Sequence, residues 1–470
     1  MLRFSMTTTG TVLFALDAVL IVTVWPLVLW VSRTQILSNF EFVSDLRGID
    51  YPVLDLLLLF AMGLYRRDAI LETGRSLTRV PLVVGMGAAL AIMLSLIQPS
   101  LMPMATVPGG RDQAMLFGLA VFSFTGCAFL ARLVIDALLR RHVLRRRLLI
   151  VGAGQRAWEL LFMLGREGSS LHDDVTLVHD VREQVDPRLL HDRSDRIFCP
   201  TNFNVAAVAA RVEADLIVVA PDERRGMNLE RLLECKKAGF PVIQYLSFVE
   251  REIRRIDLKR VELGWLVYGD GFTFGALDRF LKRAFDLIVS FLVLLLTAPL
   301  IAAGMIAIRS EGPGPILYRQ ERVTLDGKVF PIMKLRTMRV NAEANGAVWA
   351  MEKDNRITRV GNFLRRTRID ELPQLVNILR GEMSFVGPRP ERPIFVKELA
   401  EKIPLYNERH MVKAGLTGWA QINYPYGASI DDARSKLSYD LYYVKNFSIL
   451  FDFVILLQTL RVVLWPSGAR

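Results

Sequence analysis

The chain has 470 residues, of which 52% are hydrophobic, and its formal net charge at pH 7 is +11. This balance is typical of a membrane-attached protein with soluble parts and disfavours a single globular core; the length allows about three domains. The three cysteines, Cys127, Cys199 and Cys235, are scattered. They match neither a disulfide framework nor metal-ligand spacing, and they fit a reducing cytoplasmic compartment.

Residues 1–147 are predicted to form a transmembrane helical region. Four apolar runs lie there, at residues 12–31, 51–65, 80–97 and 115–139. Three of them approach or exceed the roughly 20 residues that cross the hydrocarbon of a bilayer, and the second does so only if it begins near Leu46. We therefore expect a four-helix membrane region whose second helix is the shortest.

The arginines between these runs predict the orientation. They gather between the second and third runs and after the fourth: Arg66, Arg67, Arg75, Arg79, Arg140, Arg141, Arg145, Arg146 and Arg147. By the positive-inside rule, both ends of the region lie in the cytoplasm, so the protein is multi-pass with its other domains cytoplasmic. The cluster after the fourth run lies beside the membrane, and we expect it to contact anionic lipid and no nucleic acid.

Residues 148–265 alternate between strand and helix patterns. Buried strands are predicted at 148–151, 175–178 and 216–220. The first ends in Gly152, followed by Gly154 and Ala157, which is the glycine-rich turn of a Rossmann-like α/β domain. Such a turn could hold a dinucleotide with Asp180 on a ribose. The favoured alternative is that the glycines only allow the turn from strand to helix, because a fold alone does not establish a function.

Residues 278–470 form the last predicted domain, which holds two further apolar runs. The run at 285–308 is long enough to span, but basic residues flank both ends: Arg279, Lys282, Arg283 and Arg309. Pro299 lies near its middle and is expected to bend the helix. We expect a re-entrant helix with both ends in the cytoplasm; the alternative is an ordinary spanning helix. The run at 448–465 is interrupted by Asp452, Gln458 and Arg461, which predicts an interfacial helix.

Asp370 and Glu371 are adjacent carboxylates in an arginine-rich segment shortly before Pro373. Proline is tolerated in the first turn of a helix, so the carboxylates are predicted to lie at a helix N-terminus, where free N–H groups attract anions. With the arginines, this end can hold a phosphate beside a carboxylate, which is a setting for phosphoryl transfer. Alternatively, Thr367 and Asp370 form an ordinary capping box.

Seven sequence blocks stand in order along this domain. They are GPGP at 312–315, YRQER at 318–322, GK at 327–328, KLRTM at 334–338, DE at 370–371, GPRP at 387–390 and KAGLTGWAQIN at 413–423. With these blocks, the chain from Lys282 onward resembles the bacterial sugar transferase family, the monotopic polyprenyl-phosphate phosphoglycosyl transferases. With its two N-terminal domains, it resembles the long members that act in exopolysaccharide biosynthesis.

The resemblance implies a fold and a reaction. The catalytic domain is expected to be mainly helical and monotopic, held by the re-entrant helix on the cytoplasmic face of the bacterial inner membrane. It would transfer a sugar 1-phosphate from a UDP-sugar to undecaprenyl phosphate and release UMP, the first membrane step of glycan assembly. Asp370 would attack the phosphate next to the sugar and carry the phosphosugar as an acyl phosphate.

The other site residues follow from the same resemblance. Glu371 would ligate Mg²⁺, a hard cation that prefers carboxylate oxygens. Four basic residues match positions that bind phosphate oxygens: Lys334, Arg336, Arg365 and Arg389. Arg366 and Arg368 could equally be solvated or face lipid. The chain departs from the family pattern at Ala298, where serine usually precedes the proline. It also departs at residues 423–427, so the resemblance does not identify the sugar that is transferred.

Two other classes of protein remain as alternatives. A membrane-anchored nucleotide-sugar dehydratase or epimerase would need a Tyr-x-x-x-Lys pair, and none of the eleven tyrosines has lysine four residues later. A catalytically silent scaffold of a polysaccharide assembly complex would have no need of the carboxylate pair with its basic partners. The expected partners are therefore the UDP-sugar, undecaprenyl phosphate and membrane lipids, and a homo-oligomer is compatible with the sequence.

Overall fold

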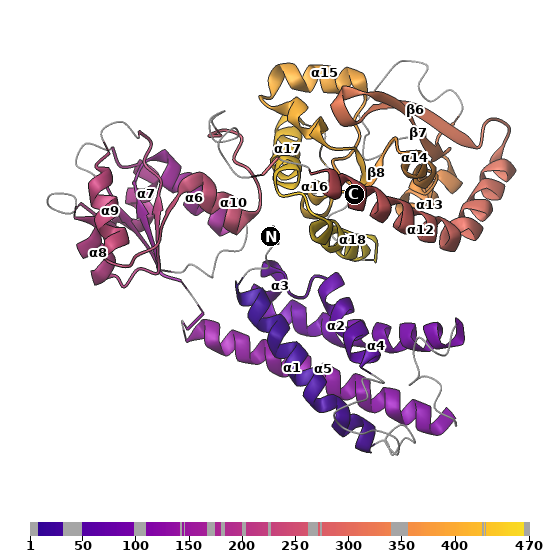
Figure 1. Cartoon of the computed structure of the whole chain (residues 1–470), viewed down its shortest axis with the longest axis horizontal. Coiled ribbons are helices and arrows are strands. Elements are labelled where there is room, and N and C mark those ends of the chain that lie inside the picture. Colours follow the sequence, from indigo (N-terminus) through magenta and orange to yellow (C-terminus); the bar gives the residue numbers. More distant parts are fainter. Residues whose placement is uncertain are drawn as a thin grey trace. The chain divides into compact units, whose positions relative to one another are not determined.

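The protein is described from a computed structural model. The described residues are 8–31, 49–97, 110–141, 143–144, 146–166, 174–179, 184–199, 204–223, 227–261, 271–272, 275–339, 356–424, 427 and 429–464. The chain divides into two compact units, Met6–Ile253 and Arg254–Arg470 with the first five residues. The first unit holds a helical bundle and an α/β domain, and each part is described by itself (Figure 1).

The helical bundle contains the predicted apolar runs. Its helices are α1 (Thr8–Val31), α2 (Asp50–Ala61), α3 (Arg67–Leu71), α4 (Thr73–Ile97) and α5 (Gly110–Arg140). Three of them, α1, α4 and α5, are long and apolar enough to cross a membrane. The described part of α2 has 12 residues, about 18 Å, which is shorter than the roughly 30 Å of hydrocarbon. The residues around Leu46, on which a second span depends, lie outside the described residues.

A buried arginine connects three of these helices through an ion pair and a hydrogen bond. Arg132 of α5 is 3% exposed and donates from Nη1 to Oδ2 of Asp17 of α1, which is fully buried, at 3.0 Å. The Nε of Arg132 also donates to Oγ of Ser76 of α4 at 3.1 Å. A charge in a bilayer is tolerated when it faces the interior of a bundle and is paired. The pair therefore orients α1, α4 and α5 toward one another.

The α/β domain is built on a parallel sheet. Its strands are β1 (Leu148–Val151), β2 (Val175–Val178), β3 (Ile197–Phe198), β4 (Leu216–Val219) and β5 (Val242–Gln244). They pair in the order β3-β2-β1-β4-β5, which is an order of doubly wound sheets. Its helices are α6 (Gln155–Arg166), α7 (Pro187–Arg193), η4 (Ser194–Arg196), α8 (Val205–Arg211), α9 (Leu229–Lys237) and α10 (Tyr245–Ile253).

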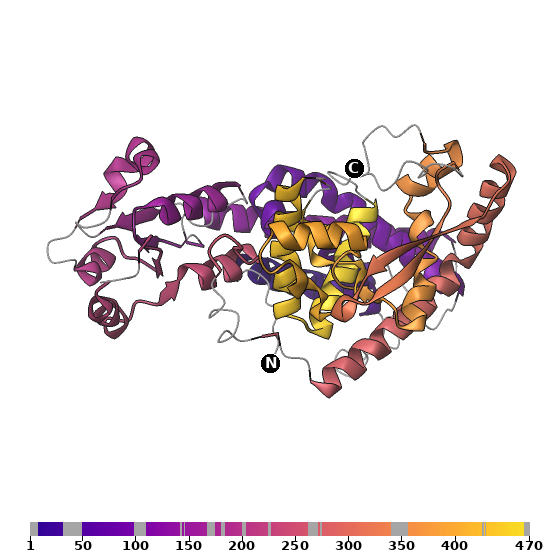
Figure 2. The same ribbon diagram turned by 90° about the horizontal axis from the view of Figure 1, so that it is seen from above.

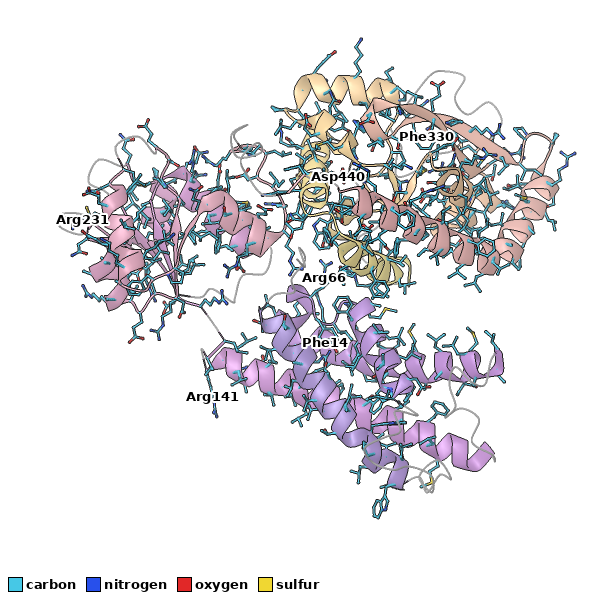
Figure 3. All side chains as sticks on the ribbon, viewed as in Figure 1. Phe14, Arg66, Arg141, Arg231, Phe330 and Asp440 are labelled. Carbon is cyan, nitrogen blue, oxygen red and sulfur yellow. The ribbon has the colours of Figure 1, made fainter. Side chains whose placement is uncertain are left out.

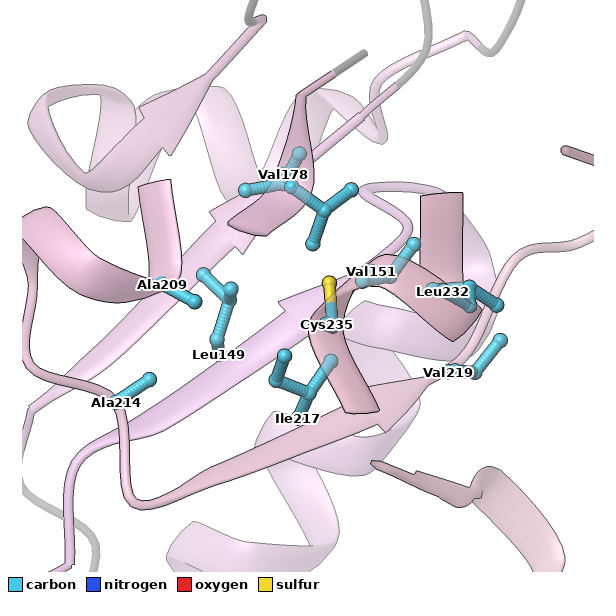
Figure 4. Close-up of a cluster of buried hydrophobic side chains, with 10 residues drawn as sticks. Leu149, Val151, Val178, Ala209, Ala214, Ile217, Val219, Leu232 and Cys235 are labelled. Carbon is cyan, nitrogen blue, oxygen red and sulfur yellow. The ribbon is translucent and has the colours of Figure 1, made fainter. Parts of the chain in front are cut away.

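The core of this domain explains its strand pattern. β1, β2 and β4 are buried along their whole length, as expected for parallel strands covered on both faces. Figure 4 shows one side of the core, where Leu149 and Val151 of β1 and Ile217 of β4 pack against Cys235 of α9. The strands predicted from the apolar runs are present in the structure.

The C-terminal unit is mainly helical and holds two small sheets. Its helices are α12 (Ala276–Glu311), η6 (Leu325–Gly327), α13 (Arg359–Arg366), η7 (Ile369–Glu371), α14 (Gln374–Arg380), α15 (Pro393–Lys402), η8 (Tyr406–Met411), α16 (Trp419–Asn423), α17 (Ile430–Lys445) and α18 (Ile449–Leu464). β6 (Leu317–Val323) and β7 (Val329–Leu335) form an antiparallel hairpin. β8 (Ser384–Val386) and β9 (Gly415–Thr417) pair in parallel.

The helix α12 has 36 residues with Pro299 in its second half, and its ribbon changes direction in both views (Figures 1 and 2). The hydroxyl of Thr297 donates to the carbonyl of Val293 at 2.7 Å, a side-chain bond that helps to bend a helix. Because proline has no N–H, the bend begins where the backbone ladder is interrupted.

Both ends of α12 contact the same compact unit. Near its start, Lys282 donates from Nζ to Oδ2 of Asp452 at 2.7 Å. Near its end, Ile308 packs with Leu335 of β7 and Leu364 of α13. The two flanks, which are basic in sequence, are therefore held by one folded body.

The last helix, α18, keeps its polar side chains inside the C-terminal unit. Asp452 is fully buried between Lys282 and the hydroxyl of Tyr443, which donates to Oδ1 at 2.8 Å. Arg461 donates to the carbonyl of Ile422 at 3.2 Å. The polar residues that interrupt this run in the sequence thus serve packing within the unit, where partners distant in the chain satisfy them.

Candidate active site

The two adjacent carboxylates lie in η7, a single 3₁₀ turn between α13 and α14. Arg368 enters the turn in the left-handed region at φ +59°, and Pro373 leaves it at φ −60°, ready for the helix that follows. Asp370 is 7% exposed and Glu371 9% exposed. The predicted helix N-terminus is thus a tight turn leading into α14, and it buries both carboxylates.

Glu371 is fixed by two cations from distant parts of the chain. Its Oε1 accepts from Nζ of Lys334, on β7, at 3.0 Å and from Nη2 of Arg389 at 2.7 Å. Arg389 follows β8 in the 387–390 segment. Although burial opposes ionisation, the charges of Arg389 and Lys334 hold the pKa of Glu371 well below its usual range. The two cations therefore favour the ionised form of Glu371 and fix the position of its Oε1.

A layer of buried polar residues positions Arg389. Arg409 donates from Nη2 to the carbonyl of Arg389 at 3.0 Å and to Oδ2 of Asp440 at 2.8 Å. Its Nη1 donates to the hydroxyl of Tyr406 at 2.7 Å. Asp440 lies on α17 inside the unit (Figure 3). The backbone at Arg389 is thus tied to α17, which restricts where its guanidinium can reach.

Asp370 differs from its neighbour in its hydrogen bonding and in the direction of its pKa shift. Its Oδ1 is buried and has no hydrogen-bond partner within the described part of the chain. Burial, and next the charge of Glu371, raise the pKa of Asp370 to about 6, against the opposing charges of Lys334 and Arg365. A carboxylate whose pKa is raised is more basic, and hence more nucleophilic once ionised, than one whose pKa is lowered by paired cations.

The capping-box alternative for this turn is wrong in its geometry. The hydroxyl of Thr367 donates to the carbonyls of Phe363, at 2.9 Å, and Leu364, at 3.2 Å, and so closes the C-terminal turn of α13. No side chain caps η7 among the described residues. A capping role therefore does not account for Asp370.

The four predicted phosphate-binding residues fall into two groups. Lys334 and Arg389 contact Glu371, and the charge of Arg365 acts on Asp370 while its Nε donates to the hydroxyl of Thr337 at 2.9 Å. Arg336 instead donates from Nη1 to the carbonyl of Pro313 at 3.0 Å, which ties down the loop after α12.

Two residues of the site had no clear signal in the sequence. Arg368, for which a solvated or lipid-facing side chain was an equal expectation, lowers the pKa of both Asp370 and Glu371 by its charge. Arg409 supports Arg389 from 20 residues away, and its partner Asp440 lies 31 residues further along the chain. In the sequence, the only indication of Arg368 is the run of arginines before the carboxylate pair. No local pattern indicates Arg409.

The residues present are compatible with Mg²⁺ as a cofactor only with help from substrate. No group of three or more His, Cys, Asp or Glu side chains suited to a metal occurs within the described ranges. Mg²⁺ is commonly held by one or two carboxylates together with substrate phosphates. Glu371 would supply the carboxylate for such a site.

The glycine-rich turn of the α/β domain is occupied by a carboxylate of the same domain. Asp222 accepts from the backbone N–H of Gln155 at 2.7 Å and of Arg156 at 2.8 Å, at the start of α6. A Cβ on Gly154 would lie 2.0 Å from Oδ2 of Asp222, and Gly152 has φ +125°. The glycines thus allow this close approach, while Asp180 lies outside the described residues.

Comparison with known proteins identifies a family and several relatives. The model of a family described as bacterial sugar transferase matches residues 277–466. A UDP-N-acetylgalactosamine-undecaprenyl-phosphate N-acetylgalactosaminephosphotransferase of Aeromonas hydrophila is 37% identical over 265 residues, 56% of this chain and 61% of that protein. A UDP-glucose:undecaprenyl-phosphate glucose-1-phosphate transferase of Escherichia coli is 40% identical over 262 residues, 49% of this chain and 56% of that protein.

A shorter relative delimits the shared part. An exopolysaccharide production protein of Rhizobium leguminosarum is 40% identical over 192 residues, which are 39% of this chain but 94% of that protein. The chain thus matches nearly the whole of this relative, whereas it matches 61% and 56% of the length of the other two. The protein belongs to the bacterial sugar transferase family.

Proposed function

We propose that this protein transfers a sugar 1-phosphate from a UDP-sugar to a polyprenyl phosphate, with release of UMP, as the first membrane step in assembling an exopolysaccharide or related glycan. The observation that carries the proposal is the contrast within the carboxylate pair. Glu371 is held by Lys334 and Arg389, whereas Oδ1 of Asp370 is buried and unpartnered among the described residues. The names of the relatives, which specify UDP-sugars and undecaprenyl phosphate, support the substrate classes.

The reaction proceeds in two displacements. A carboxylate oxygen of Asp370 attacks the phosphorus bonded to the sugar; the bond from that phosphorus to the bridging oxygen breaks, and UMP leaves with the electron pair. An oxygen of the lipid phosphate then attacks the same phosphorus, and the carboxylate of Asp370 leaves. The product is a polyprenyl diphosphate sugar, and the enzyme returns to its starting state.

The surrounding cations serve these steps by position and charge. Arg365 and Arg368 act on Asp370 by their charge and would bind the phosphate oxygens that approach it. Lys334 and Arg389 hold Glu371 and retain donors for the diphosphate. Glu371 would hold Mg²⁺ together with substrate phosphate oxygens, and the ion would neutralise charge on the diphosphate.

The membrane arrangement is part of the proposal. The unit that carries the site lies on the cytoplasmic face of the bacterial inner membrane, and α12 enters the bilayer and returns on the same side. The contacts of Lys282 with Asp452 and of Ile308 with Leu335 support this geometry, because one folded body holds both ends of the helix. The helices α1, α4 and α5 supply the membrane-crossing segments.

The test is an activity assay of the full-length protein in nanodiscs with undecaprenyl phosphate, Mg²⁺ and a panel of UDP-sugars. We expect one or a few sugars to yield UMP and a lipid diphosphate product. Asp370→Asn should abolish both products, while Asp326→Asn, the same change in the turn of the β6–β7 hairpin, should leave them unchanged. A full-length protein that releases no UMP with any sugar would instead favour a silent scaffold.

A further inference from the structure

A groove of about 630 Å³ lies where α12 ends and the β6–β7 hairpin begins. Its lining residues come from the last turn of α12, the Gly-Pro-Gly-Pro loop and the start of β6: Arg309, Gly314, Pro315, Ile316, Leu317 and Arg319. Three of these side chains are apolar and two are guanidinium groups. The groove is separate from the carboxylate pair, which contributes no lining residue.

The two arginines are available to an anion. Both are exposed, and neither makes an ion pair with a carboxylate of the described residues. Elsewhere in this unit cations are engaged, as Lys334 is with Glu371 and Lys282 with Asp452. Two guanidinium groups beside an apolar floor match a phosphate attached to a hydrocarbon chain.

The groove continues the apolar surface of α12. Along this helix, large apolar side chains are exposed up to its last turns, including Leu296 at 75% and Ile306 at 72%. Arg309 follows one turn after Ile306. A lipid chain lying along this face would therefore place its phosphate between Arg309 and Arg319, at the boundary between hydrocarbon and water.

The groove and the turn that carries Asp370 also pack against the same hydrophobic residues. Ile316 and Leu317 of the groove pack against the cluster of Ile308, Leu335 and Leu364, and so does Ile369, the residue before Asp370. In the hairpin, Tyr318 lies opposite Lys334, which contacts Glu371. The groove and the turn that carries Asp370 therefore pack against the same hydrophobic cluster.

We propose that this groove binds the phosphate monoester of the polyprenyl acceptor, held between Arg309 and Arg319 with its first isoprene units on the apolar floor. The assignment rests on the proposed transfer to a lipid phosphate. A monoester carries more negative charge than the phosphodiester of a bulk phospholipid, and two guanidinium groups lining one groove favour the more charged group. The groove would deliver the acceptor from the face of α12 toward Asp370.

The test compares Arg309→Gln and Arg319→Gln with the control Arg279→Gln, which removes an exposed arginine at the other end of α12. The full-length protein is placed in nanodiscs of phosphatidylcholine, with or without phosphatidylglycerol. We expect each groove variant to raise the apparent KM for undecaprenyl phosphate by about tenfold, the loss expected for one charge-assisted contact. The KM for the UDP-sugar should stay within about twofold, since that substrate binds elsewhere.

Two results would overturn the assignment. One is an unchanged KM for the acceptor in both groove variants. The other is a defect that appears only with phosphatidylglycerol and equally in Arg279→Gln, which would show contact with bulk anionic lipid. If the groove assignment fails in this way, wild-type turnover still supports the proposed function; a wild-type protein that forms no lipid product would refute the function itself.

Discussion

At the scale of single residues, two neighbouring carboxylates acquire opposite properties from their surroundings. Glu371 accepts hydrogen bonds from Lys334 and Arg389, which favour its ionised form, whereas Oδ1 of Asp370 is buried and has no hydrogen-bond partner among the described residues. The 3₁₀ turn makes this divergence feasible, because consecutive residues in it point in different directions. Pairs of acids pushed apart in pKa commonly divide the work of a reaction. In the proposed reaction, Glu371 binds and Asp370 attacks.

The first prediction concerns pH. Because burial and Glu371 raise the pKa of Asp370 to about 6, the carboxylate is protonated below that pH and cannot attack. We expect kcat/KM for the UDP-sugar to rise as the pH increases through about 6 and to level off above it. Steady-state assays across this range measure the profile. A profile that stays flat down to about pH 5 would exclude Asp370, with this pKa, as the group that must be ionised.

The second prediction contrasts the stability of two variants at neutral pH. The raised pKa of Asp370 means that its ionisation costs stability above that pKa, so Asp370→Asn should leave the Tm unchanged or raise it. Glu371 has a lowered pKa and stabilises the fold at neutral pH. Glu371→Gln leaves Lys334 and Arg389 without their partner and should lower the Tm by on the order of 5 °C.

Thermal unfolding of both variants in the same detergent provides the comparison for this contrast. Glu371→Asp, which keeps the charge on a shorter side chain, serves as the control and should recover part of the loss. Equal Tm values for Asp370→Asn and Glu371→Gln would contradict the different roles of the two carboxylates.

The sequence identifies the reactive residues better than the residues that hold them. Asp370, Glu371, Lys334 and Arg389 stand in short blocks whose order is informative, and the structure brings these four together. The role of Arg409 cannot be predicted from such a block, because its partners are the backbone carbonyl of Arg389 and the side chain of Asp440, 31 residues away. Pairing between buried polar groups leaves no local pattern, so the supporting layer had to be seen in space.

At the scale of elements, α12 decides how the site meets the membrane. By length and composition alone, it is one of four helices in the described part of the chain that are able to cross a bilayer. Its polar contacts argue otherwise, since Arg283 donates to the carbonyls of Ile378 and Leu379 near its start and Glu311 accepts from the N–H of Val360 at its end. Because both ends of α12 are bonded to one folded unit, these contacts favour the proposed re-entrant geometry over a spanning helix.

The third prediction tests this topology. In a protein without its native cysteines, Leu277→Cys before the apolar stretch and Gly314→Cys after it should both react with a membrane-impermeant maleimide only when cells are opened. Thr34→Cys, in a loop predicted to face outward, serves as the control and should react in intact cells. Labelling of Leu277→Cys and Gly314→Cys from opposite sides would show that α12 spans the membrane.

At the scale of the whole molecule, local sequence patterns predict the secondary structure but not the contacts between residues that are distant in the chain. Apolar periodicity predicts the strands of the α/β domain and the long helices of the bundle, because both signals are local. The partner of the glycine-rich turn is distant in the chain. Asp222 accepts a hydrogen bond from the backbone N–H of Arg156, which lies 66 residues before it. The same limit applies to Arg132 and Asp17, which are 115 residues apart.

The proposed reaction requires a covalent intermediate at Asp370, which can be trapped in a single-turnover experiment. The purified full-length protein is mixed with a UDP-sugar labelled in the phosphate next to the sugar, without lipid acceptor, and quenched within one turnover. We predict release of up to one UMP per active site and a labelled peptide whose modified residue is Asp370. No release of UMP before the acceptor is added, or label on Glu371 in place of Asp370, would contradict a covalent intermediate at Asp370.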